Sequence, residues 1–283
     1  MVFAALLWSI AGVVTRQLES ARSFEVTFWR SAFNALALIV ILSVLRGPGM
    51  LWQRIRQGDR AFWIASVCWA VMYTAFMLAL TLTTVANVLV LIALTPLITA
   101  LAARFALGHR LAARTWGAIV LAGAGIVWMY AREVSGADAR QLLGMAIGLA
   151  VPLAAALNWT LMQHNRGAAQ QDMLPAVLIG ALLSALATVV PALPFAATTA
   201  DLGLLALLGV VQLAIPCLLA VVVARSLPAP EISLLGLLEV IFGVLWAWLG
   251  ANEAPSASVL AGGALVLAAL AGNELLALRE RRL

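Results

Sequence analysis

The stretch ALTLTTVANVLVLIALTPL at residues 79–97 is followed by LGHRL at 107–111 and by WGAIVLAG at 116–123. A similar order recurs later, where ARSLPAPEISLLGLLEVI at 224–241 precedes LGANE at 249–253 and AGGALVLAA at 261–269. The chain therefore repeats its own architecture. Each half holds about five apolar segments that are long enough to span a bilayer. Because five is odd, the second copy must cross the membrane in the opposite orientation, an arrangement typical of secondary transporters.

The composition predicts an all-α membrane protein. Apolar residues make up 64% of the 283 residues and charged residues only 10%, whereas a soluble chain is nearer half apolar and a quarter charged. A β-barrel is excluded because its strands would alternate polar and apolar residues, and no polar stretch is long enough to form a soluble domain. The net charge of +5 comes from arginine without lysine, and in a membrane protein it indicates loops beside lipid rather than a nucleic-acid partner.

We expect ten transmembrane helices that form two inverted five-helix repeats, residues 1–135 and residues 136–283. The expected spans are 2–18, 24–45, 61–81, 84–105, 114–131, 141–163, 173–195, 202–224, 230–250 and 256–277.

The arginines predict the orientation of these spans, since cytoplasmic loops are enriched in positive charge. One set of alternate loops, with the C-terminal tail, contains Arg46, Arg54, Arg56, Arg60, Arg104, Arg110, Arg114, Arg166, Arg225, Arg279, Arg281 and Arg282. The other set contains only Arg16, Arg22, Arg132 and Arg140. We therefore expect both termini to be cytoplasmic.

Two charged residues fall inside expected spans, where a charge costs about 2.5–3.5 kcal/mol on insertion scales. Arg30 lies about two turns into the second span, and the favoured interpretation is that it snorkels outward or pairs with a carboxylate, for example Glu25, or with a freed carbonyl. Direct contact with a substrate is the alternative. Glu239 lies about halfway along the ninth span. It is either a cavity group that contacts a cation or carries a proton, or a neutral carboxyl packed between helices.

Prolines and amides within spans indicate where a cavity could form. Pro96, Pro152 and Pro216 each remove a helical hydrogen bond, and the freed carbonyls are tolerated at membrane depth where protein or a cavity satisfies them. Simple kinks are the alternative. Asn158 and Gln212 are candidate cavity amides, although a buried amide often serves only to join helices.

Aromatic residues are the remaining signal. Trp69, Tyr73 and Phe76 share one helical face, and Tyr73 and Trp159 lie deep enough to stack on an apolar or planar substrate. Packing between helices is the more common explanation for any single aromatic residue.

The sequence contains no enzyme motif and no metal-ligand spacing. Cys68 and Cys217 both lie in apolar segments and are interpreted as small buried hydrophobic residues. We therefore expect neither catalytic residues, nor a metal site, nor a cofactor.

At the repeated segments the chain resembles the drug/metabolite transporter superfamily, and within it the ten-helix EamA-type exporters. The residues that carry the resemblance are Trp8, Arg30, Thr95-Pro96-Leu97, Leu107-Gly108, Gly117, Leu237-Leu238-Glu239, Leu249-Gly250, Glu253 and Gly262. Val240 stands where the family commonly has proline. Among these exporters the chain looks most like the bacterial aromatic amino-acid exporters, which are inner-membrane proteins.

The resemblance and the residue pattern together predict an inner-membrane exporter of small metabolites, namely amino acids with apolar or aromatic side chains. The expected cavity residues are Trp8, Tyr73, Asn87, Thr95, Asn158, Trp159, Gln212 and Glu239. An exporter of cationic or hydrophobic drugs is the alternative, and a membrane enzyme is less favoured. The expected partners are a small-molecule substrate and the lipid bilayer.

The arginine distribution gives a first testable prediction. Reporters fused at Leu283 and near Ser135 should report opposite sides of the membrane, because an odd number of spans separates the two positions. The measurement is the activity of reporters that work only in the cytoplasm or only outside it. Reporters on the same side would contradict the topology.

Overall fold

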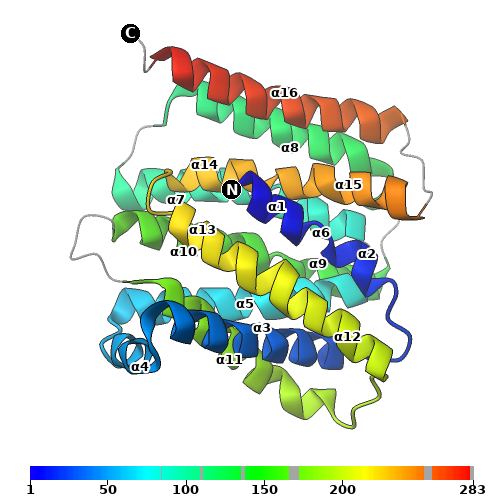
Figure 1. Cartoon of the computed structure of the whole chain (residues 1–283). Coiled ribbons are helices and arrows are strands. Elements are labelled where there is room, and N and C mark those ends of the chain that lie inside the picture. The colour runs from blue at the N-terminus through cyan, green and yellow to red at the C-terminus, as the bar shows by residue number, and fades with distance from the viewer. Residues whose placement is uncertain (84, 109–110, 135–137, 166–171, 252–256, 281–283) are drawn as a thin grey trace.

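A computed structural model describes the chain except residues 84, 109–110, 135–137, 166–171, 252–256 and 281–283. The expected boundary at 135 and 136 lies outside the described residues, as do Arg110, Arg166, Glu253, Arg281 and Arg282. Every regular element that the structure describes is helical, and most of the helices run side by side in one bundle (Figure 1). The protein is therefore an all-α membrane protein.

Five expected spans are continuous helices. They are α3 (Ser23–Arg46), α5 (Arg60–Leu82), α8 (Ala113–Val134), α11 (Leu174–Ala192) and α16 (Ala257–Glu280). Across the described residues, seven segments are long and apolar enough to cross a membrane, and three shorter apolar helices, within 2–15, 113–128 and 257–273, occupy the other expected spans. The number of spans, about ten, agrees with the sequence pattern.

The other five expected spans are interrupted. They comprise α1 (Val2–Trp8) with α2 (Ala11–Thr15), α6 (Val85–Ile92) with α7 (Thr95–Leu107), α9 (Ala139–Gly148) with α10 (Ala150–His164), α12 (Thr199–Leu207) with the π-helix η1 (Leu208–Ala214) and α13 (Ile215–Val223), and α14 (Ala229–Gly236) with α15 (Leu238–Ala251).

Proline marks three of these interruptions and is missing from two. Proline lies in the first turn of α7 (Pro96), of α10 (Pro152) and of α13 (Pro216). The N–H groups of a first turn have no acceptor within their own helix, so the N–H group that proline lacks costs no helical hydrogen bond there. The first span is interrupted at Ser9 and Ile10, and the ninth at Leu237, without a proline. The ninth span therefore breaks although Val240, and not a proline, follows the interruption.

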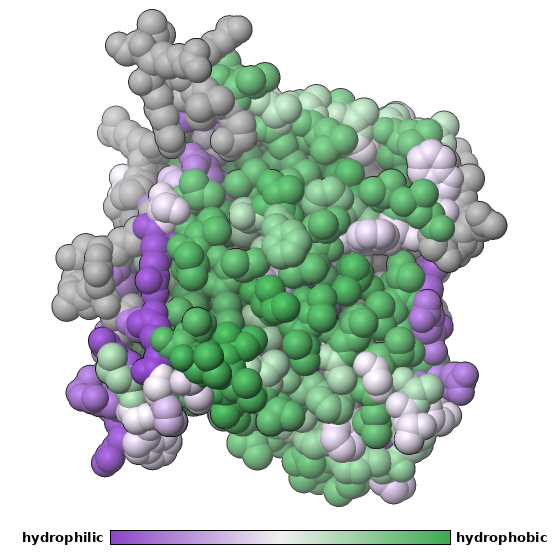
Figure 2. Space-filling view, viewed as in Figure 1, coloured by the Kyte–Doolittle hydropathy of each residue, from purple (hydrophilic) through white to green (hydrophobic). Residues whose placement is uncertain are grey.

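The surface matches a protein surrounded by lipid. Figure 2 shows a broad hydrophobic face bordered by hydrophilic residues at two opposite margins. On α3, Leu36, Val40 and Val44 lie one turn apart and are 58%, 56% and 80% exposed. Between α3 and α5 lies the short helix α4 (Pro48–Arg56), with Leu51 buried and Arg54 and Arg56 exposed.

The spans pack in pairs through small residues. α8 packs along α16, and α3 packs along α11. Where α8 meets α16, a Cβ atom at Gly125 would lie 2.7 Å from the carbonyl oxygen of Gly262. Where η1 crosses α3, one at Gly209 would lie 2.7 Å from the carbonyl oxygen of Arg30. Glycine thus allows the backbones to approach closely at these crossings, as in other membrane helices.

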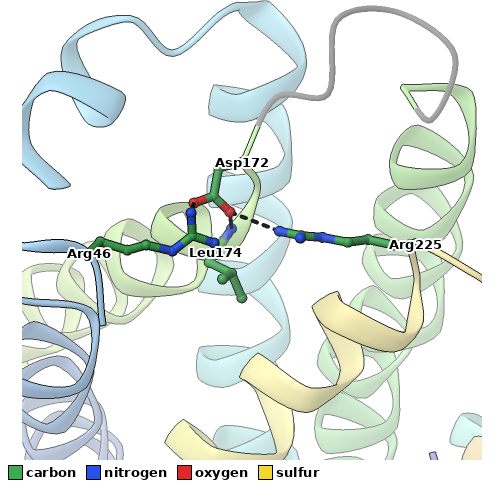
Figure 3. A network of polar contacts seen from close by, with 4 residues as sticks. All are labelled: Arg46, Asp172, Leu174 and Arg225. Atoms are coloured by element: carbon green, nitrogen blue, oxygen red, sulfur yellow. Dashed lines mark hydrogen bonds and ion pairs between the residues drawn. The ribbon is translucent and has the colours of Figure 1, made fainter. Parts of the chain in front are cut away.

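At the arginine-rich end of the bundle, Asp172 joins three elements (Figure 3). Its carboxylate lies 3.3 Å from Nη1 of Arg46, at the end of α3, and 3.1 Å from Nη2 of Arg225, which follows α13. The same carboxylate accepts a hydrogen bond of 3.3 Å from the N–H of Leu174, at the start of α11. Asp172 therefore connects the second, seventh and eighth spans.

At the opposite end, two buried carboxylates accept hydrogen bonds from main-chain N–H groups. Glu25 accepts from Ala196 and Ala197, with a shortest distance of 2.7 Å. Asp201 accepts from Glu19 at 2.9 Å and from Ser20 at 3.1 Å. The bonds of Glu25 join α3 to the segment before α12, and those of Asp201 join α12 to the loop between the first and second spans.

Candidate substrate cavity

A cavity lies among the interrupted helices, with about 130 Å³ of space for the centres of water-sized molecules. A buried water needs about 10–15 Å³ on this measure, so the cavity has room for a small organic molecule. Its walls come from α1, α3, α5, α6, α7, α10, η1, α13, α14 and α15, and therefore from both halves of the chain. The spans that line it include all five interrupted ones.

One wall is aromatic. Trp69, Tyr73 and Phe76 line the cavity from one face of α5, and Trp159 faces them from α10. The rings of Trp69 and Tyr73 stack with centroids 5.6 Å apart, and Trp159 meets Trp69 edge-on at 5.7 Å. The rings hold one another in place while also bordering the cavity. Such a surface suits an apolar or planar group.

Polar groups at the interruption of the first span form hydrogen bonds with side chains of other spans. Nε2 of Gln212 donates a hydrogen bond of 3.2 Å to the carbonyl oxygen of Trp8, the last residue of α1. Next to it, Nε1 of Trp246 donates to Oγ of Ser9 at 2.9 Å. Because Gln212 belongs to the π-helix η1, the broken eighth span supplies the partner that the broken first span needs.

Several polar atoms of lining residues have no hydrogen-bond partner within the described structure. They are Nη1 of Arg30, Nε1 of Trp69 and Oε1 of Gln212. Most buried polar groups in proteins are hydrogen-bonded, so unpaired donors and acceptors around one cavity need water or a ligand. The cavity thus offers both an apolar surface and unpaired polar groups.

Arg30 does not take the position that the sequence favoured. It is 2% exposed and lines the cavity instead of snorkelling outward. Glu25, five residues before Arg30, accepts hydrogen bonds from the N–H groups of Ala196 and Ala197. The apolar surroundings of α3 gave no helical periodicity from which the direction of Arg30 could be read, so the sequence did not identify it as a cavity residue.

Six of the eight expected cavity residues line the cavity. They are Trp8, Tyr73, Thr95, Trp159, Gln212 and Glu239. Asn87 and Asn158 are fully buried but are not lining residues. Nδ2 of Asn87 donates to Oγ1 of Thr83 at 2.7 Å, and Asn158 adjoins the cavity face that Ala155 and Trp159 form on α10.

The described residues contain no group of three or more histidine, cysteine or acidic side chains that could hold a metal ion. Cys68 and Cys217 are buried free thiols, and Cys217 lines the cavity.

Residues 1–131 match the EamA-like transporter family, which is a family of transporters and not of enzymes. No curated protein matches the chain. Twenty-eight chains of solved structures are similar. One is a crystal structure described only as that of a protein; it has 18% sequence identity and a TM-score of 0.80, and the similarity covers 98% of this chain and 96% of the other. At this identity the similarity shows the fold alone.

The bond between Gln212 and the Trp8 carbonyl gives a second prediction. Gln212→Met keeps most of the volume but removes the donor, so we expect the free energy of unfolding to fall by about 1–3 kcal/mol. The neighbouring Leu213→Met conserves volume in the same wall and should cost less than about 1.5 kcal/mol. Thermal unfolding of both variants in detergent measures the difference, and equal losses would show that the hydrogen bond contributes nothing.

Proposed function

We propose that this protein is a membrane transporter of the EamA-like family. It would export small zwitterionic metabolites, amino acids with apolar or aromatic side chains, by alternating access. The cavity residues from the two halves would bind the substrate near the middle of the bilayer. Export from a bacterial cytoplasm across the inner membrane, with both termini cytoplasmic, is part of the same proposal. The concentration of arginine at one end of the bundle supports that orientation.

The observation that carries the proposal is the composition of the cavity wall. The stacked rings of Trp69, Tyr73 and Trp159 provide an apolar surface on one side. Gln212 and Glu239 lie on elements of the second half and provide polar groups. An amino acid with an apolar side chain presents the same two kinds of surface. Tyr73 and Trp159 would contact its side chain, and Glu239 its amino group.

Two inverted repeats are the proposed basis of the transport cycle, and the packing of helices supports them. α3–α11 and α8–α16 join spans that are equivalent in the two halves, the second with the seventh and the fifth with the tenth. Other contacts also occur once in each half. The third span (α5) packs on the sixth (α10), and the equivalent eighth span (α13) packs on the first (α1). The fourth span (α7) likewise packs on the sixth (α10), and the equivalent ninth span (α15) packs on the first (α1). A two-fold axis in the membrane plane would produce these paired contacts.

Interrupted helices at equivalent positions fit the same scheme. The first and sixth spans are interrupted, and so are the fourth and ninth. Broken helices around a site shared by the two repeats are typical of secondary transporters. Rocking of the halves about the cavity would then expose it to one side of the membrane at a time.

An exporter of cationic drugs is the second candidate, because the acidic Glu239 and the aromatic wall would also suit a hydrophobic cation. Arg30 lines the same cavity and would repel such a cation. The two candidates therefore differ in whether a substrate needs an anionic group.

The aromatic wall gives a third prediction. Purified protein in proteoliposomes should transport aromatic amino acids better than small or charged ones in a panel of amino acids. Trp159→Ala or Tyr73→Ala should weaken this transport several-fold, because a stacking contribution of about 0.5–1.5 kcal/mol is lost. The matched control is Trp52→Ala on α4, whose side chain is 61% exposed and lies outside the cavity.

If neither aromatic variant changes transport while the protein level is preserved, these rings serve only to pack α5 against α10. If no amino acid in the panel is transported, the proposed substrate class is wrong.

Glu239→Gln gives a fourth prediction, since the amide is nearly isosteric but cannot carry a negative charge. If Glu239 binds an amino group, the affinity for substrate should fall at every pH tested. If it carries a proton, dependence on a pH gradient should disappear while substrate exchange continues. We expect the first result, because Glu239 is the one acidic side chain among the described residues that line the cavity. Transport by Glu239→Gln with unchanged affinity and rate would rule out a role in translocation.

A further inference from the structure

Arg30 is a buried cation whose hydrogen-bonding groups face a cavity. It is the eighth residue of α3, is 2% exposed and lines the cavity together with Tyr73 and Gln212. Its guanidinium carbon lies 5.6 Å from the centroid of the Phe76 ring. Nη1 has no hydrogen-bond partner among the described residues. A guanidinium carries five N–H donors in one plane, so contact with a ring over one face does not satisfy these donors.

None of the carboxylates among the described residues forms an ion pair with Arg30 within 4.0 Å. Asp172, far along the chain at the arginine-rich end, pairs with Arg46 and Arg225 and not with Arg30. Glu239 lines the same cavity without pairing with Arg30 at that distance. A charge at membrane depth is costly unless it is paired or hydrated. The space between these two charged side chains is therefore a place for a ligand that carries both signs.

We propose that Arg30 binds the carboxylate of the transported zwitterion, an inference that rests on the proposed function. The planar fork of a guanidinium matches the two oxygens of a carboxylate, whereas an ammonium group is a point charge. Arg30 belongs to the first half of the chain and Glu239 to the second. A zwitterion that bridges them gives each of the two charged side chains a direct partner of opposite sign.

This arrangement determines which substrates are accepted. A substrate with an amino group but no carboxylate leaves Arg30 unpaired and adds a second cation beside it. A substrate with a carboxylate but no amino group leaves Glu239 unpaired. An apolar zwitterion satisfies both groups and also covers the aromatic wall.

The test compares three probes that share a phenyl ring: phenylalanine, phenylethylamine, which lacks the carboxylate, and 3-phenylpropionate, which lacks the amino group. The full chain in proteoliposomes is assayed as wild type, Arg30→Gln and Arg30→Lys, with Arg56→Gln on the exposed face of α4 as the matched control. For Arg30→Gln we expect KM for phenylalanine to rise about tenfold to a hundredfold, while transport of phenylethylamine is unchanged or improved. Arg30→Lys should be intermediate, and Arg56→Gln should behave as wild type.

An equal loss of phenylalanine and phenylethylamine transport in Arg30→Gln would overturn the proposal, because a purely structural arginine would affect both probes. If the Arg30 variants do not fold, wild-type protein gives the answer. Phenylglyoxal modifies guanidinium groups, and mass spectrometry of the peptide that contains Arg30 measures the extent. Phenylalanine and 3-phenylpropionate should protect Arg30, and phenylethylamine should not. Equal protection by all three probes, or by none, would also overturn the proposal.

The same measurement separates this inference from the proposed function. If the wild type transports no amino acid, the proposed function fails. Protection of Arg30 by 3-phenylpropionate would then still establish a carboxylate site, and lack of protection would remove that site as well.

Discussion

A main-chain carbonyl inside a bilayer must find a partner within the protein or in a water-filled cavity, and this requirement determines where the helices can be interrupted. The clearest case is the end of α1, where the Trp8 carbonyl accepts from Gln212. Gln212 can reach it because η1 interrupts the eighth span, and π-helical turns occur often at functional sites. The interruptions therefore depend on one another, and the cavity lies where they meet.

The two ends of the bundle are joined by bonds of different kinds. Asp172 forms ion pairs with Arg46 and Arg225, whose side chains are 37% and 54% exposed. Pairs of this sort are weak and are screened by salt. Glu25 and Asp201 instead accept short bonds from main-chain N–H groups and are themselves fully buried. The end of the bundle that Asp172 holds therefore has the more exposed bonds.

The sequence predicted the elements better than it predicted their contacts. Long apolar segments gave the spans, and Pro96, Pro152 and Pro216 indicated three of the interruptions, because a missing N–H group is visible in the chain itself. The interruptions at Ser9 and Leu237 contain no proline that would mark them in the sequence. Arg30 shows the same limit: α3 is apolar nearly all round, so periodicity could not show which face meets the cavity. Asn87 and Asn158 look equally suitable as cavity residues until the rotation of their helices is known.

The contacts of Glu25 and Asp201 also bear on how this protein can change during evolution. Glu25 accepts from the backbone N–H groups of Ala196 and Ala197, and Asp201 accepts from those of Glu19 and Ser20. None of these bonds uses a side chain of the residue that donates. Any residue other than proline can supply such a donor. Homologous chains can therefore substitute freely at the four donor positions, while the two acidic residues are hard to replace. Variable loops beside two invariant acids are the pattern that an alignment of close relatives should contain.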